Sequence, residues 1–127
     1  MITGLAHAAI NAADLERSLH FYRDILGFPV VEDLTLESGV RLVHVRVGER
    51  ATVELFGRPE PLAPIPAVSQ AGLVHLALAV DDVDAVYADL AAKGVEFTGE
   101  PRPGRGQTRR LVFCKDPDGT LIEFVEK

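Results

Sequence analysis

Apolar and polar residues alternate along the first half of the chain in patterns that predict one strand, one helix and three further strands. The apolar run at 5–10 suits a buried strand. From Asp14 onward apolar residues recur at helical spacing, with Asp14 as the N-cap and Gly27 as the left-handed residue that ends the helix. Strands are then expected at about 29–36, 40–47 and 51–56, because turn residues separate three strand-forming runs. The predicted order is βαβββ.

The second half of the chain repeats this order. Residues 7–10 match residues 75–78, residues 14–15 match 82–83, Gly27 matches Gly94, and residues 53–56 match 122–125. Four matches in one order indicate an internal duplication. The second copy therefore predicts a strand at 73–80, a helix from Asp82 to Gly94, and strands at about 95–100, 108–115 and 120–125, with a hairpin turn at 116–119.

These elements predict an α+β fold made of two βαβββ modules. Module one spans 1–57 and module two spans 72–127, and residues 58–71 form a linker that holds four of the eight prolines. A four-stranded sheet with one helix leaves its second face uncovered. We therefore expect a single domain, 1–127, in which the modules form a cupped, mixed β-sheet with one helix per module on its outer face.

Strand alternation singles out four polar residues for the uncovered faces. His7 and His75 occupy the same position in the first strand of each module, and Glu54 and Glu123 the same position in the fourth. One such histidine alone is more often a core residue, but an ionised carboxylate in an apolar strand needs a partner. Two imidazoles and two carboxylates suit a divalent Zn, Ni, Co, Mn or Fe(II) ion. The sequence therefore predicts one metal ion per site, held by these four residues.

Further candidates surround this face. His44 and Arg46 alternate with valines and share a face with Leu42, so either side chain can contact a substrate, and Arg46 is equally well explained as a rim residue. Arg110, next to Arg109 and the loop Gly104-Arg105-Gly106, is a third candidate for substrate binding, although most such loops are solvated turns. His20 is expected on the helix surface, and Cys114 as a small buried residue.

Composition excludes several classes of protein. The 127 residues carry a formal net charge of −6, which opposes binding to nucleic acid or to anionic membranes. A single cysteine excludes an intramolecular disulfide and a cysteine-rich zinc module. Apolar runs fall short of the ~20 residues of a membrane helix, and the first residues lack the pattern of a signal peptide. We expect a cytoplasmic protein.

Several of these motifs resemble the vicinal oxygen chelate superfamily, which includes glyoxalase I, methylmalonyl-CoA epimerase, extradiol dioxygenases and bleomycin-binding proteins. The resemblance rests on His7-Ala8-Ala9-Ile10, on residues 14–22 with Leu26-Gly27-Phe28, and on residues 116–123. It covers essentially the whole chain. A ligand set of His, Glu, His and Glu is similar to that of bacterial glyoxalase I, whereas the approach to His75 lacks the Tyr/Gly-rich segment of that enzyme. The linker and residues 39–43 are more similar to the epimerases.

The resemblance implies a metal-dependent lyase or isomerase of the glyoxalase type. It would transfer a proton on a small-molecule substrate that chelates the metal through vicinal oxygens, with Glu123 as the base by analogy and Glu54 almost equivalent by module symmetry. The alternatives are an epimerase, an extradiol-type dioxygenase and a non-catalytic antibiotic- or metabolite-binding resistance protein. We expect a homodimer, in which the four ligands come either from one chain or from His7 and Glu54 of one chain and His75 and Glu123 of the other.

Overall fold

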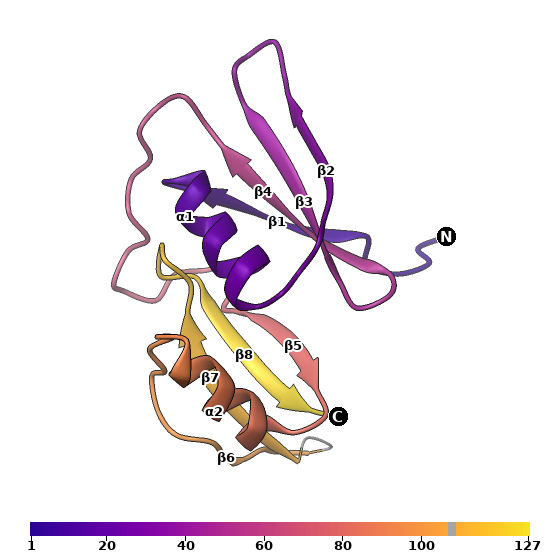
Figure 1. The fold of residues 1–127 in the computed structure, drawn as a ribbon, viewed down its shortest axis with the longest axis vertical. Coiled ribbons are helices and arrows are strands. Elements are labelled where there is room, and N and C mark those ends of the chain that lie inside the picture. Colours follow the sequence, from indigo (N-terminus) through magenta and orange to yellow (C-terminus); the bar gives the residue numbers. More distant parts are fainter. Residues whose placement is uncertain (107–108) are drawn as a thin grey trace. The chain divides into compact units, whose positions relative to one another are not determined.

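The computed structural model describes residues 1–106 and 109–127 and confirms the predicted fold class (Figure 1). The chain divides into two compact units, Met1–Ala63 and Pro64–Lys127. Each unit is a βαβββ module with a four-stranded mixed sheet. The boundary between the units falls within the segment expected to be a linker. None of the helices in the described part of the chain has the length and apolar composition that crossing a membrane requires.

The first unit has its strands in the order β1-β4-β3-β2. β1 pairs in parallel with β4, and the other pairs are antiparallel. The elements are β1 (His7–Ala12), α1 (Leu15–Leu19), the π-helix η1 (His20–Ile25), β2 (Val30–Thr35), β3 (Arg41–Val47) and β4 (Ala51–Gly57).

The second unit repeats this topology in the order β5-β8-β7-β6. β5 pairs in parallel with β8, as β1 does with β4. The elements are β5 (Leu76–Val80), α2 (Val83–Ala92), β6 (Arg102–Pro103), β7 (Arg110–Lys115) and β8 (Leu121–Glu126). Asp116 makes the last hairpin turn, since its side chain accepts hydrogen bonds from the backbone N–H groups of Asp118 and Thr120.

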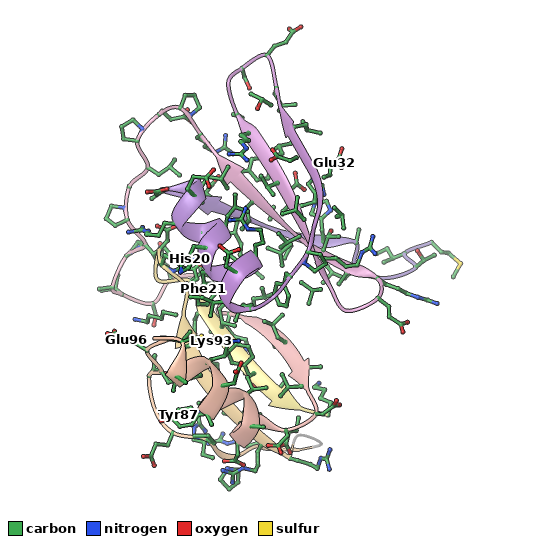
Figure 2. All side chains as sticks on the ribbon, in the orientation of Figure 1. His20, Phe21, Glu32, Tyr87, Lys93 and Glu96 are labelled. Atoms are coloured by element: carbon green, nitrogen blue, oxygen red, sulfur yellow. The ribbon has the colours of Figure 1, made fainter. Side chains whose placement is uncertain are left out.

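The first helix differs from a regular α-helix in its second half. Asp14 caps its start by accepting from the N–H of Arg17, as expected. From His20 the turns widen to a π-helix, in which the N–H of Leu26 donates to the carbonyl of Phe21. The wider turn lets two consecutive aromatic residues, Phe21 and Tyr22, both reach the core, where their rings meet edge to face. His20 lies on the exposed side, beside Asp24 (Figure 2).

One predicted strand is wrong. Residues 95–100 contribute a single bridge, between Phe97 and Cys114, and the strand that pairs with β7 is the short β6. Phe97 packs against Tyr87 of α2, so this segment covers the core instead of extending the sheet. The seventh strand was expected from residue 108, which lies outside the described residues, and β7 begins at Arg110.

Each helix covers one face of its own sheet, and alternation decides which residues lie beneath it. In the first unit these are Val43, Val45, Val53 and Leu55, and in the second Val112, Cys114, Ile122 and Phe124. Burial raises the pKa of the Cys114 thiol to about 12, so this residue is packed as a small apolar side chain, as expected. The candidate glutamates Glu54 and Glu123 lie on the opposite faces, which no helix covers.

Helix α1 packs closely against β4 at Gly57. A Cβ atom at this position would lie 2.7 Å from Cδ2 and 3.0 Å from Cβ of Leu15. We therefore predict that Gly57→Ala lowers the free energy of unfolding by about 1–3 kcal/mol, the usual cost of overpacking. Gly99→Ala is the matched control, because a Cβ there meets open space. Urea unfolding of both variants tests this, and equal stability of the two would contradict the packing described.

Candidate functional site

The helix-free face of the first unit brings His7 and Glu54 together. Register pairs Ala9 of β1 with Glu54 of β4, so the small alanine leaves room beside the glutamate, and His7 lies one diagonal step away. Nε2 of His7 is 3.0 Å from Oε2 of Glu54. Glu54 is only 7% exposed, although it carries a carboxylate in the middle of a strand. Such a group needs a polar partner in place of water, and the imidazole supplies one.

A second imidazole contacts the same carboxylate. His44 of β3 stands directly opposite Glu54 in the antiparallel register, and its Nε2 lies 3.5 Å from Oε1. The two histidines therefore contact different oxygens of Glu54, with their ring centroids 6.2 Å apart. His44 was predicted as a substrate contact, and the structure places it beside the proposed metal ligand.

The second unit holds the equivalent pair. Ala77 pairs with Glu123, as Ala9 does with Glu54, and Nε2 of His75 is 2.8 Å from Oε2 of Glu123. The residue opposite the glutamate is here Phe113, whose ring meets the imidazole of His75 edge to face with the centroids 5.4 Å apart. Each module thus has its own His–Glu pair. The modules differ in the residue opposite the glutamate, which is His44 in the first and Phe113 in the second.

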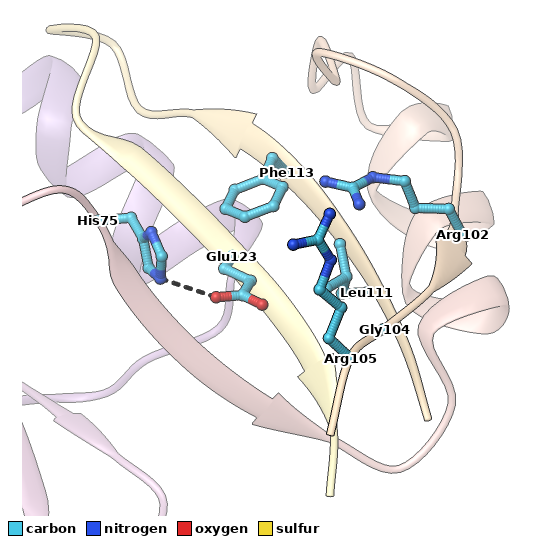
Figure 3. Close-up of a pocket in the computed structure, with 7 residues that line it drawn as sticks. All are labelled: His75, Arg102, Gly104, Arg105, Leu111, Phe113 and Glu123. Carbon is cyan, nitrogen blue, oxygen red and sulfur yellow. Dashed lines mark ion pairs between the residues drawn. The ribbon is translucent and has the colours of Figure 1, made fainter. Parts of the chain in front are cut away.

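A pocket of about 340 Å³ opens beside this second pair (Figure 3). Its lining combines charged and apolar side chains. The guanidinium of Arg102 lies over the ring of Phe113, 5.8 Å from its centroid, and Figure 3 shows Arg102 and Arg105 reaching in from the segment next to β7. The lining residues are His75, Arg102, Gly104, Arg105, Leu111, Phe113 and Glu123.

The structure separates the arginines that sequence reasoning had grouped. Arg110 lies on the helix side of its sheet and forms an ion pair with Asp84 of α2, with Nε 2.8 Å from Oδ2. This placement gives no support to the prediction that Arg110 binds substrate. Arg46 is exposed on the same face as His44. Arg102 and Phe113 were missed, although strand alternation places Phe113 opposite Glu123 once the register of β7 and β8 is known.

An acidic group at the start of α2 has a structural explanation. Carboxylate oxygens of Asp82, Asp84 and Glu126 lie within 4.8 Å of one another. Asp82 caps the helix through the N–H of Ala85, and Glu126 accepts from the N–H of Val83. Asp84 is paired with Arg110. These carboxylates are therefore balanced by the helix N-terminus and by arginine.

The donor atoms of each His–Glu pair are spaced as metal ligands would be. Two neighbouring donors of one ion, each about 2.1 Å from it, are about 3 Å apart at an octahedral ion and about 3.4 Å apart at a tetrahedral one. The separations of 3.0 Å between His7 and Glu54 and of 2.8 Å between His75 and Glu123 match the octahedral spacing. Imidazole nitrogen and carboxylate oxygen also suit a divalent transition ion. The residues present therefore fit the metal that the sequence predicts.

Comparison with known proteins agrees with this architecture. The family model of the Glyoxalase/Bleomycin resistance protein/Dioxygenase superfamily matches residues 4–124. This chain belongs to that superfamily. Members typically use a divalent metal ion and commonly bind small-molecule substrates. The match confirms the vicinal oxygen chelate fold.

Individual relatives carry more than one activity. The mitochondrial methylmalonyl-CoA epimerase of Homo sapiens is 34% identical, over 94% of this chain and 72% of the relative. A probable lactoylglutathione lyase of Synechocystis sp. (strain ATCC 27184 / PCC 6803 / Kazusa) is 30% identical, over 96% and 94%. The crystal structure of a glyoxalase family protein from Enterococcus faecalis is 28% identical, with a TM-score of 0.84 over 97% of each chain. These superfamily relatives support an enzyme of the vicinal oxygen chelate type in general.

Proposed function

We propose that this chain is a metal-dependent enzyme that moves a proton on a carbon next to a carbonyl group. One divalent ion, Zn, Ni, Co, Mn or Fe(II), is held by His7, Glu54, His75 and Glu123. The substrate is a small molecule that presents two vicinal oxygens. When bound, the ion polarises the chelated carbonyl and so acidifies the adjacent C–H bond.

The observation that carries this proposal is the repeated His–Glu pair. Each module presents one imidazole and one carboxylate, about 3 Å apart, with His7 at the start of β1 and His75 directly before β5. Two ionised carboxylates and two neutral imidazoles balance the charge of a divalent ion. The ion in turn offsets the desolvation of both carboxylates, which lie largely out of solvent.

Glu123 is the residue that we propose as the base. It lines the 340 Å³ pocket, so a substrate that occupies this pocket lies against its carboxylate. The proton passes from the substrate carbon to an oxygen of Glu123 and is then delivered to the substrate again. A base must lie within about 3 Å of the proton it accepts, and a carboxylate in the pocket wall satisfies this when substrate is bound.

The pocket also supports a substrate class. Arg102 and Arg105 bring two positive charges to one side of an acidic chain, and planar guanidinium groups bind carboxylate or phosphate through paired hydrogen bonds. Leu111 and Phe113 supply an apolar wall. An acyl compound with a carboxylate or phosphate beyond its chelating oxygens fits this lining.

An epimerase is the second candidate, favoured by the 34% identity to the human methylmalonyl-CoA epimerase. Epimerisation uses the same proton removal but returns the proton to the opposite face of the carbon. The stereochemistry of the product therefore distinguishes the two candidates, since an isomerase converts the substrate to a constitutional isomer and an epimerase inverts one centre.

The test is exchange of the substrate C–H with solvent deuterium, screened over 2-oxo thioesters and hemithioacetals. Glu123→Gln keeps an oxygen donor but cannot accept a proton at neutral pH. We predict that it retains metal and loses exchange at least ~100-fold. The exposed Glu37→Gln is the control for loss of one negative charge and keeps wild-type exchange. Wild-type exchange in Glu123→Gln would move the role to Glu54, and substrate-dependent uptake of dioxygen would favour a dioxygenase.

We also propose that the chain forms a homodimer. Leu5 and Leu73, at equivalent positions two residues before His7 and His75, are 84% and 96% exposed, although leucine is usually buried. Pairing of two chains would cover such residues. Sedimentation equilibrium at micromolar concentration should give twice the mass of 13.7 kDa. A strict monomer at that concentration would contradict the assembly.

A further inference from the structure

The two glutamates that the duplication makes equivalent have different neighbours. Opposite Glu54 stands His44, and opposite Glu123 stands Phe113, although both strand pairs have the same register. The first carboxylate is therefore contacted on both oxygens, by His7 at Oε2 and by His44 at Oε1. The second is contacted by His75 at Oε2, and its cross-strand neighbour is a ring without a hydrogen-bonding group.

We propose that His44 is a positioning residue that fixes Glu54 as a permanent metal ligand. The inference rests on the proposed function and adds a division of labour to it. A Glu54 carboxylate held at Oε1 by His44 would keep its orientation and would present Oε2 to a bound ion. Glu123 lacks this second imidazole and lines the pocket, so it would be the carboxylate that accepts the proton of the substrate.

The geometry of His44 suits this role. It lies on the strand next to Glu54, and its imidazole is half-buried, so neighbouring side chains limit its movement. The separation of 3.5 Å is longer than an ordinary hydrogen bond of about 3 Å. The contact is therefore an electrostatic one that a small side-chain movement converts into a hydrogen bond from Nε2–H to Oε1. Loss of a residue that holds a metal ligand in place typically lowers the affinity of the protein for the metal roughly 10- to 100-fold.

His44→Phe is the natural test, because it gives module one the residue that module two already has. Binding of Co²⁺ to the metal-free protein is measured by calorimetry, and the visible absorption of the Co²⁺ complex reports the ligand geometry. We predict that His44→Phe weakens Co²⁺ binding at least ~10-fold and alters the absorption bands. His44→Gln, which retains an N–H donor, restores most of the affinity. His20→Phe makes the same exchange at an exposed helix position and leaves both measurements unchanged.

The outcomes separate this inference from the function on which it rests. A wild-type protein that binds no Co²⁺ contradicts the metal site itself. A wild-type protein that binds Co²⁺, together with a His44→Phe variant of equal affinity and spectrum, contradicts the role of His44 and leaves the metal site standing. Loss of affinity in His44→Phe without recovery in His44→Gln also contradicts it, since packing alone would then explain the loss. Thermal unfolding of each variant establishes that it is folded.

Discussion

A carboxylate placed in the middle of a mostly apolar strand is the constraint on which each module depends. Desolvation of such a charge costs several kcal/mol unless polar partners or a cation replace the lost water (about 3–5 kcal/mol when one partner is removed). In module one the partner is the imidazole of His7 in the neighbouring parallel strand, and in module two it is His75, one residue before the equivalent strand β5. An alanine beside each carboxylate leaves the space that the pair occupies. The sheet register, the small residue and the pair therefore belong to one arrangement.

Duplication produces this arrangement twice, and the two copies differ in the residue opposite the glutamate. His44 adds a second imidazole to the first carboxylate. At the equivalent position Phe113 packs against His75, and the guanidinium of Arg102 lies over its ring. Both Phe113 and Arg102 line the pocket. The unequal roles that we propose for Glu54 and Glu123 follow from this one difference. Glu54 faces a hydrogen-bonding group, His44, whereas Glu123 faces Phe113, which is part of the pocket wall.

The sequence was most informative where a residue's role depends on periodicity. Alternation along β1 and β4 was sufficient to place His7 and Glu54 on the helix-free face, and the N-caps Asp14 and Asp82 were evident from residue type. Features that depend on packing between elements were missed. The π-helix follows from two adjacent aromatic residues that both reach the core, and Phe97 leaves the sheet because it packs on α2. The cation–π contact of Arg102 depends on the path of a loop, which local sequence does not determine.

The central claim is that the two His–Glu pairs form one metal site. Native mass spectrometry of the metal-free protein, titrated with Co²⁺, tests it most directly because it counts bound ions. The account predicts saturation at one ion per chain, whatever the number of chains in the assembly. Saturation at two ions per chain, one for each His–Glu pair, would contradict a shared site, and a protein that binds none would contradict the metal centre altogether.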